Sequence, residues 1–219
     1  VNRQIPQHHK LANLTVKTSN LCSEITLPTG IDKDGRDRTA VCCLSSLNLE
    51  KYDEWKDDPD MIGDVMRFLD NVLSDFINKA PEQFKDAKYS AERERSVGLG
   101  VMGFHSFLQK KRIPLESVMA KSWNKKIFKN IHEKVNQASK DLAEERGACP
   151  DAAEYGFKER FSNKTAIAPT ASISIICGGA SPGVEPIAAN SYTHKTLSGS
   201  FNVRNRSVSY THLTLPTTD

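Results

Sequence analysis

An amide, a thiol and a carboxylate recur at every second residue near the N-terminus, as Asn20, Cys22 and Glu24. In an extended strand alternate side chains share a face, so these three groups are predicted to project together. A thiol beside a proton acceptor is suited to nucleophilic or hydrogen-atom chemistry at sulfur. The same spacing is also typical of an ordinary strand with a polar outer face. The residues alone therefore leave both interpretations open.

The cysteines favour chemistry or core packing over disulfide formation. Their number, five, is odd, no pair forms a CxxC motif, and a chain of 219 residues does not depend on disulfide staples. This usage predicts a reducing, cytoplasmic compartment. The histidines, including His8, His9 and His194, have no metal-ligand spacing to any cysteine, so no metal site is expected. The cysteines are Cys22, Cys42, Cys43, Cys149 and Cys177.

A second candidate site is a stretch of small and hydroxyl-bearing residues at 169–173. Hydroxyl groups and exposed backbone N–H groups at the start of a helix can hold a phosphate without a lysine. The alternative interpretation is a turn rich in small residues. The stretch consists of Pro169, Thr170, Ala171, Ser172 and Ile173.

Residues 98–103 form a GxGxxG pattern, which raises the hypothesis of a nicotinamide-dependent oxidoreductase. A dinucleotide-binding fold requires an apolar strand before the glycines and an acidic residue about 20 positions later. Residues 91–95 before the glycines are charged and helix-like, and residues 113–115 make a poor second strand. We therefore interpret the glycines as positions of close packing.

Overall composition excludes two classes of partner. Hydrophobic residues make up 38% of the chain and the formal net charge is only +3. This balance gives no reason to expect a nucleic-acid track. The longest apolar runs, such as 173–177, are too short to span a bilayer, so no membrane is expected.

The elements that must position the candidate residues follow from periodicity. Extended segments are predicted at 21–27 and 40–49, joined by a charged turn at 32–37. Helices are predicted over 61–77, capped by Asp60, and over 123–146, between Ser122 and Gly147. Strand-like segments separated by long helices predict an α/β architecture. Periodicity does not distinguish an open sheet from a barrel.

Five motifs, in order along the chain, resemble the large (alpha, catalytic) subunit of class I ribonucleotide reductases. The resemblance covers residues 19 to 205. Ser-Asn-Leu-Cys-Ser-Glu-Ile at 19–25 is similar to the family's finger loop, and Ala-Val-Cys-Cys-Leu-Ser-Ser-Leu-Asn-Leu at 40–49 is similar to its redox-cysteine strand. Arg-Ser-Val-Gly-Leu-Gly-Val-Met-Gly at 95–103 is similar to its glycine-rich segment. Ala-Pro-Thr-Ala-Ser-Ile-Ser at 168–174 is similar to its substrate-phosphate loop, and Ser-Pro-Gly-Val-Glu-Pro at 181–186 is similar to the segment beyond that loop.

The resemblance implies a role for each matching residue. Cys22 would be the thiyl radical that removes the 3′ hydrogen of a ribonucleotide, Glu24 would take the 3′ hydroxyl proton and Asn20 would hold the substrate. Cys42 would be one of the two redox-active cysteines, with Cys43 structural, although either could be the redox thiol. Leu21 and Ser23 would contact substrate together with 169–173, which would bind its diphosphate.

The resemblance also implies a fold, cofactors and partners. The fold would be roughly the C-terminal half of a ten-stranded α/β barrel around a central finger loop. The parent protein would reduce ribonucleoside diphosphates as a large-subunit homodimer, with electrons from thioredoxin or glutaredoxin. A separate small (beta) subunit would carry the metal and radical cofactor, and ATP and dNTP effectors would bind outside this chain, which itself would bind no cofactor. An alternative is a non-catalytic relative in which Cys22 is structural.

The two ends of the sequence predict an internal fragment. The chain begins without methionine, and 208–213 is the peptide that the bases GTC TCT TAT ACA CAT CT encode in a sequencing-library adapter. We therefore expect residues 1–207 to be a partial barrel domain and 208–219 to be translated adapter. On this hypothesis the chain alone is inactive, and neither Tyr192 nor Tyr210 belongs to the family's radical relay.

Overall fold

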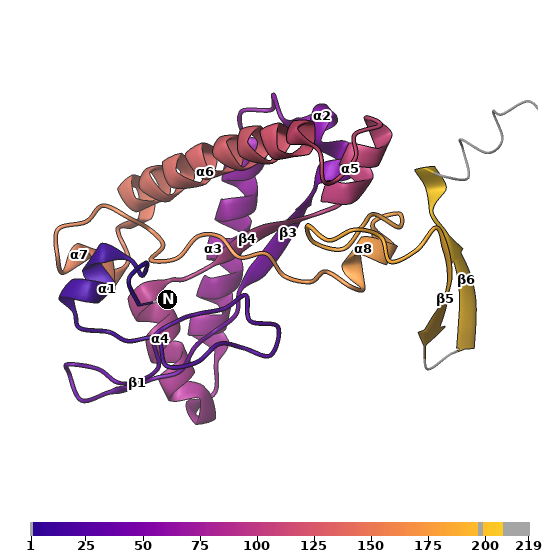
Figure 1. Cartoon of the computed structure of the whole chain (residues 1–219). Coiled ribbons are helices and arrows are strands. Elements are labelled where there is room, and N and C mark those ends of the chain that lie inside the picture. Colours follow the sequence, from indigo (N-terminus) through magenta and orange to yellow (C-terminus); the bar gives the residue numbers. More distant parts are fainter. Residues whose placement is uncertain (1, 197–198, 208–219) are drawn as a thin grey trace, which may run out of the picture.

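Two parallel strands lie at the centre of the chain (Figure 1). The structure is a computed structural model, and it describes residues 2–196 and 199–207. Strand β3 (Leu44–Asn48) pairs in parallel with β4 (Gly98–Met102), with Leu44 opposite Gly98 and Asn48 opposite Met102. A single parallel bridge joins Leu99 to Thr165 and brings a third segment to the far side of β4.

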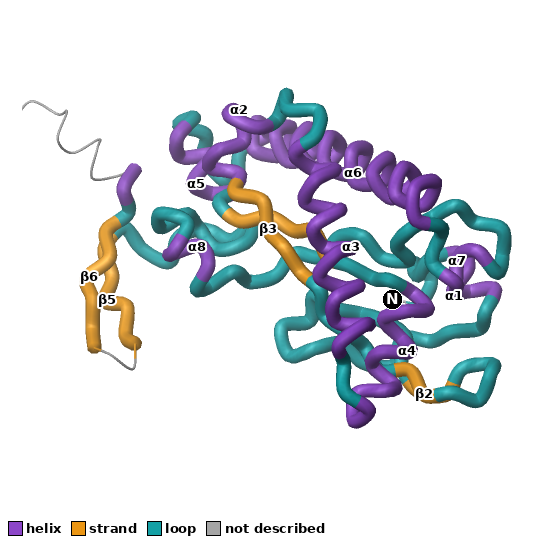
Figure 2. The backbone as a smooth tube through the Cα atoms, turned by 180° about the vertical axis from the view of Figure 1, so that it is seen from behind, coloured by secondary structure: helices purple, strands orange, loops and turns teal. Residues whose placement is uncertain are grey.

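Helices connect these parallel segments and cover one side of them (Figures 1 and 2). Between β3 and β4 the chain forms α2 (Tyr52–Trp55), α3 (Met61–Lys79) and α4 (Lys85–Glu94), with short 3-10 turns at Leu49–Lys51 and Glu82–Phe84. Between β4 and Thr165 it forms α5 (Phe104–Lys110), α6 (Val118–Arg146) and α7 (Pro150–Ala153). The predicted α/β architecture is confirmed.

Helix α3 forms because apolar residues recur at helical spacing. Its buried stripe is Ile62, Met66, Leu69, Leu73 and Ile77, whereas Val72 lies outside the stripe and is 43% exposed. The prediction that the Asp60 side chain caps this helix is wrong. The Asp58 carboxylate accepts the backbone N–H groups of residues 60 and 61, because it lies one turn ahead of them.

Helix α6 begins five residues earlier than the sequence predicted. The side chain of Ser117, not Ser122, accepts the N–H of Ala120 and caps the first turn. Gly147 ends the helix as predicted, with φ at 87°. Its buried face packs against α3 and forms the main core with β3 and β4; that face includes Ile127, Ile131, Val135, Ala138 and Leu142.

Two predictions about extended segments need correction. Residues 20–25 form a turn rather than a strand, and only Leu44–Asn48 of 40–49 is a strand. The charged turn at 32–37 is present, closed by the Asp32 carboxylate and flanked by the short antiparallel strands β1 (Gly30–Ile31) and β2 (Asp37–Arg38). The N-terminal segment contains helix α1 (Gln7–Leu11).

The C-terminal part of the described chain extends away from this body. After the short helix α8 (Ile173–Ile176), strands β5 (Ser191–Thr196) and β6 (Gly199–Arg204) form an antiparallel hairpin that stands apart from the helices (Figures 1 and 2). Residues 208–219, including Tyr210, lie outside the described residues. Their interpretation as adapter, and the domain boundary at 207, stay predictions.

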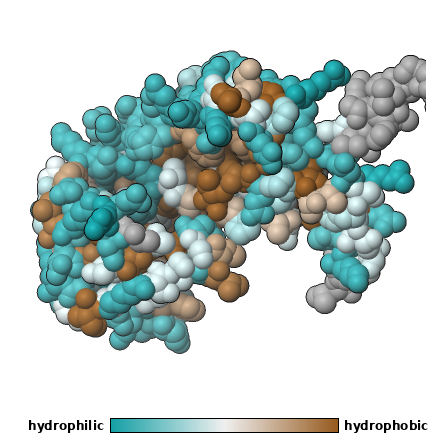
Figure 3. Space-filling model, in the orientation of Figure 1, coloured by the Kyte–Doolittle hydropathy of each residue, from teal (hydrophilic) through white to brown (hydrophobic). Residues whose placement is uncertain are grey.

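The layer of parallel segments has open edges. Within residues 2–196 and 199–207, β3 pairs with β4 alone and Thr165 pairs with Leu99 alone. Hydrophobic side chains gather at the centre of the face shown in Figure 3, with hydrophilic side chains around them. Grooves between α6 and the Thr165 segment are lined by apolar side chains that include Phe128 and Ile167. No helix of the described chain is long and apolar enough to cross a bilayer.

Candidate functional site

Residues 20–25 form a closed loop that the Asn20 side chain holds together. Its amide nitrogen donates to Glu24 Oε2 at 2.8 Å, and its amide oxygen accepts the N–H of Ile25 at 3.0 Å. The backbone closes the same loop, because Asn20 N–H donates to the Ile25 carbonyl and Ser23 N–H donates to the Asn20 carbonyl. Ser23 adopts a φ of 65°, which turns the chain back on itself. Asn20 and Glu24 thus meet across a turn and not, as predicted, by alternation along a strand.

Cys22 lies at the exposed tip of this loop. Leu21 beside it is 99% exposed, and the Cys22 thiol is free and exposed. Ile25 and Leu27, in contrast, are each 7% exposed and anchor the base of the loop in apolar surroundings. The loop therefore presents a thiol and is fixed from one side only.

Cys42 and Cys43 face opposite environments, as adjacent residues of an extended chain do. The Cys43 thiol is buried and donates to the carbonyl of Leu69 on α3 at 3.6 Å, and burial raises its pKa. The Cys42 thiol is exposed, and partial burial together with the negative charge of Glu24 raises its pKa. The structure thus leaves Cys42 exposed and within the electrostatic influence of Glu24, while its redox role stays a prediction.

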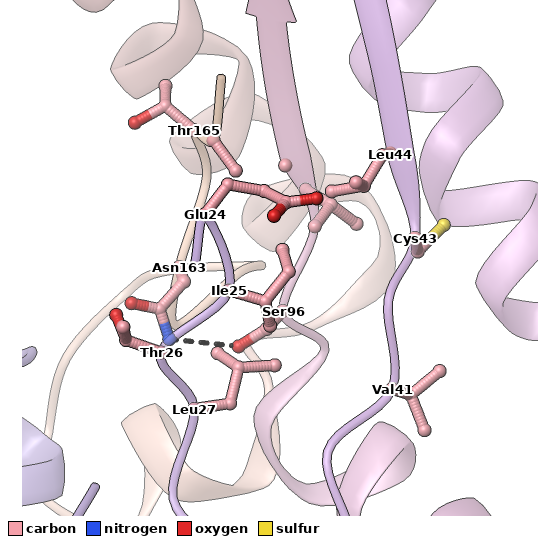
Figure 4. Close-up of a pocket in the computed structure, with 13 residues that line it drawn as sticks. Glu24, Ile25, Thr26, Leu27, Val41, Cys43, Leu44, Ser96, Asn163 and Thr165 are labelled. Atoms are coloured by element: carbon pink, nitrogen blue, oxygen red, sulfur yellow. Dashed lines mark hydrogen bonds between the residues drawn. The ribbon is translucent and has the colours of Figure 1, made fainter. Parts of the chain in front are cut away.

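A cavity of about 50 Å³ opens beside Glu24 (Figure 4). Glu24, Cys43, Ser96 and Asn163 all contribute to its wall, and Asn163 Nδ2 donates to Ser96 Oγ at 3.0 Å. Sequence reasoning assigned no role to Ser96 or Asn163. Ser96 belongs to the glycine-rich motif, but no spacing in the sequence links either residue to Glu24.

The stretch at 169–173, which was predicted to bind phosphate, is anchored to Gly183 and not to the loop at 20–25. The Thr170 side chain is buried, its φ is 54° and its hydroxyl oxygen accepts the N–H of Gly183 at 2.8 Å. Pro169, Ala171 and Ser172 are exposed, and α8 begins directly afterwards at Ile173, which is 43% exposed. Within the described chain, no hydrogen bond joins this stretch to the loop at 20–25.

The glycines of the GxGxxG pattern pack inside the sheet. Gly98 and Gly100 lie within β4, and a Cβ at Gly100 would collide with the carbonyl oxygen of Ala166. A dinucleotide-binding fold needs these glycines in the turn after the strand, where the backbone approaches a pyrophosphate. The charged helix predicted before them is α4. This placement does not favour the nicotinamide hypothesis and explains the glycines by close packing.

A network of buried ion pairs is centred on Arg38 and Asp151. Arg38 makes a two-pronged bond to Asp151, at 2.6 and 3.0 Å, and also bonds Asp32. His8 and His9 are buried against this network, and burial, with the neighbouring His9, lowers the pKa of His8 to about 4. Among the described residues, no cluster of three or more His, Cys, Asp or Glu side chains has the geometry of a metal site.

The comparisons with known proteins agree with the order of elements and motifs. The sequence model of the family described as "Ribonucleotide reductase, barrel domain" matches residues 1–160 and 151–216. The ribonucleoside-diphosphate reductase large subunit of Invertebrate iridescent virus 3 is 47% identical over 205 residues, covering 94% of this chain and 31% of that protein. A vitamin B12-dependent ribonucleoside-diphosphate reductase of Thermoplasma acidophilum is 40% identical over 170 residues, covering 72% of this chain and 21% of that protein.

A solved structure shares the fold. The class Id ribonucleotide reductase alpha subunit of Actinobacillus ureae superposes with a TM-score of 0.78 at 41% identity, covering 86% of this chain and 35% of that one. Parallel strands joined by helices around a thiol-bearing loop define an α/β barrel segment. The chain belongs to the ribonucleotide reductase family and corresponds to part of its barrel domain. It spans about a third or less of the length of these relatives.

Proposed function

We propose that this chain contributes the catalytic loop for reduction of ribonucleoside diphosphates to deoxyribonucleoside diphosphates. The observation that carries the proposal is the loop at 20–25. It exposes Cys22 at its tip while Asn20 holds Glu24 at its base and Cys42 lies within the electrostatic reach of Glu24. A structural cysteine would be expected in the core, so the exposed Cys22 supports the catalytic hypothesis over a non-catalytic relative.

The residues of the loop divide the chemistry among them. As a thiyl radical, Cys22 takes the 3′ hydrogen atom of the ribose and becomes a thiol. Glu24 takes the proton of the 3′ hydroxyl, which Asn20 helps to position. The 2′ hydroxyl leaves as water, and Cys42 with a second cysteine supplies the two electrons and becomes a disulfide. Glu24 returns its proton to the 3′ oxygen, and Cys22 returns a hydrogen atom to the 3′ carbon.

The partners and cofactors follow from the family. We propose a large-subunit homodimer that works with a small subunit, whose metal cofactor supplies the radical when that subunit is bound. Thioredoxin or glutaredoxin reduces the disulfide, and ATP and dNTP effectors bind outside this chain. Residues 169–173 receive the substrate diphosphate, supported by the exposed Ser172 and the small side chain of Ala171. A cytoplasmic location suits this chemistry because thiols stay reduced there.

Substitution of Cys22 tests this function in the full-length protein with its small subunit. We expect Cys22→Ser to abolish formation of deoxyribonucleoside diphosphate while leaving the Kd for ribonucleoside diphosphate unchanged, because a hydroxyl does not replace the thiyl radical. The matched control is Cys177→Ser, which alters another exposed thiol and is expected to retain activity. Product formation by Cys22→Ser at the wild-type rate would contradict the proposal.

A further inference from the structure

Gly183 holds the stretch at 169–173 in place. Thr170 is buried and has a φ of 54°, a conformation that a β-branched residue adopts only where its surroundings hold it. Its hydroxyl oxygen accepts the N–H of Gly183 at 2.8 Å. Gly183 also packs closely at this point, because a Cβ on it would lie 3.3 Å from the carbonyl oxygen of Ala168. The position of the stretch therefore depends on the position of Gly183.

Gly183 belongs to a segment, residues 181–187, whose start is tied to helix α5. The backbone N–H of Ser106 donates to Ser181 Oγ at 3.1 Å, and the backbone N–H of Ser181 donates to Ser106 Oγ at 2.9 Å. The N–H of Gly103, just before α5, donates to the Ser181 carbonyl at 2.7 Å. Both serines are buried. Each serine hydroxyl thus pairs with a buried N–H group of the other residue, and such a group costs free energy if it is left unpaired.

The end of the same segment is tied to the neighbouring residue of α5. The N–H of Ile187 donates to His105 Nδ1 at 3.1 Å. Nδ1 accepts a hydrogen bond only while it carries no proton. Burial lowers the pKa of the half-buried His105, which keeps the imidazole neutral at pH 7. Two adjacent residues of α5 therefore hold the two ends of 181–187, with Gly183 between them.

Helix α5 is itself fixed to the parallel strands beside the loop at 20–25. It begins directly after β4, which pairs with β3. The N–H of Gly98, at the start of β4, donates to the carbonyl of Cys43 at 2.9 Å, and Gly98 lines the same cavity as Glu24. The stretch at 169–173 is thus connected to the strands next to the loop, although no hydrogen bond of the described chain joins the two directly.

We propose that His105 and Ser106 are positioning residues that hold the stretch at 169–173 in place for the substrate diphosphate, an inference that rests on the proposed function of that stretch. Both act through residues 181–187 and Thr170. The diphosphate is remote from the reacting 3′ carbon, so its contacts stabilise the bound substrate and the transition state alike. Loosening the stretch is therefore expected to weaken substrate binding and to leave the rate of the bound complex nearly unchanged.

A pair of substitutions at His105, made in the full-length protein with its small subunit, tests this role. His105→Phe keeps an aromatic ring but leaves the Ile187 N–H without its acceptor. We expect the KM for ribonucleoside diphosphate to rise roughly tenfold at nearly constant kcat, measured by deoxyribonucleoside diphosphate formation. His105→Asn places an amide oxygen near the position of Nδ1 and is expected to restore the KM. Lys110→Gln alters an exposed residue of the same helix and is expected to change neither constant.

Ser106→Ala provides a second measurement at the other end of the segment. It removes the acceptor of the Ser181 N–H, so we expect the KM to rise in the same direction and the Kd for ribonucleoside diphosphate to rise with it. The His105 pair decides the question alone if Ser106→Ala does not fold.

Three results would overturn the positioning role. They are an unchanged KM in His105→Phe, an equal rise of the KM in His105→Asn, and a fall in kcat at constant KM, which loss of folded protein produces. Ser172→Asp separates this inference from the proposed phosphate site, because a carboxylate in the stretch repels a bound diphosphate. If Ser172→Asp leaves the KM unchanged, the stretch does not receive the diphosphate. If it raises the KM while His105→Phe does not, only the positioning role fails.

Discussion

The carboxylates on the two sides of the β3–β4 pair differ in their burial and in their hydrogen-bond partners. On the helix side, Asp70 is fully buried on α3 and bonds three arginines, Arg95, Arg146 and Arg160. On the loop side, the Glu24 carboxylate is half-buried, bonds the neutral amide of Asn20 and faces a cavity.

The difference separates a structural role from the chemical role that we propose for Glu24. Burial raises the pKa of Asp70, but hydrogen bonds from Arg160 and Arg95 outweigh burial and the pKa lies below its ordinary value. Asp70 is therefore fixed as an anion that ties α3, α4 and α6 together. The Glu24 carboxylate, in contrast, has no ion-pair partner among the described residues and is held by a neutral amide. Glu94 also has no ion-pair partner among the described residues and belongs with Glu24 in this respect.

The largest expected effect comes from removing the charge of Asp70, the carboxylate that is paired with arginines. Asp70→Asn removes the negative charge and leaves three guanidinium groups around a neutral side chain. Breaking a buried ion pair from one side costs about 3–5 kcal/mol, and we expect a loss of this size in the free energy of unfolding, measured by urea denaturation. Asp64→Asn, an exposed carboxylate on the same helix, is the control and is expected to change stability little. Equal effects of the two variants would remove the distinction between the two sides.

A pH-dependent effect of intermediate size is expected at Glu94. Burial raises its pKa from 4.5 to about 7 in the folded chain, so the folded state binds more protons than the unfolded state between these values. The free energy of unfolding contributed by Glu94 therefore falls as pH rises from about 4.5 to about 7 and stays low above that. At 1.36 kcal/mol per unit the fall is on the order of 3 kcal/mol.

Glu94→Gln isolates this contribution from those of other titrating groups. The variant cannot ionise, so we expect its stability relative to the wild type to increase with pH across the same window. Urea denaturation at a series of pH values measures the difference, with Glu92→Gln, which alters an exposed carboxylate on the same helix, as the control. A constant difference between Glu94→Gln and wild type at every pH would show that Glu94 does not titrate in this range.

The smallest expected effect is a difference in labelling rate between the thiols on the two sides, and its measurement does not change the stability of the chain. Iodoacetamide labelling followed by peptide mass spectrometry is expected to modify Cys22, Cys42 and Cys177, which are exposed, and to spare the buried Cys43 and Cys149. Cys42 is expected to react more slowly than an exposed thiol of ordinary pKa, because the thiolate is the nucleophile and the pKa of Cys42 is raised. Faster labelling of Cys43 than of Cys42 would reverse the assignment of the two faces.

Local patterns in the sequence predicted much of this architecture. Apolar periodicity located α3 and α6, Gly147 located the end of α6, and the charged run at 32–37 located a turn. The start of α6 and the capping side chain of α3 were wrong because more than one polar residue was available to cap. Asp58 and Ser117 were chosen over Asp60 and Ser122 by the path of the chain before each helix.

The residues at 20–25 were recognised from the sequence, but their geometry was not. Alternation predicted a strand because the residue types suit one, whereas Asn20 bonds its own loop and Ser23 adopts a positive φ. Such side-chain to backbone bonds compete with extended structure. The identity of the group at the site could thus be read from residue types and order, while the turn that joins Asn20 to Glu24 could not.

The sequence by itself determined the α/β class, the family and the thiol that the loop presents, because these depend on residue types in a fixed order. Only the tertiary structure decided which of the two adjacent cysteines is exposed, and it alone brought Ser96 and Asn163, far apart in the chain, to the same cavity. The physical reason is that parallel segments joined by long helices create neighbours separated by many residues. No local pattern encodes these contacts.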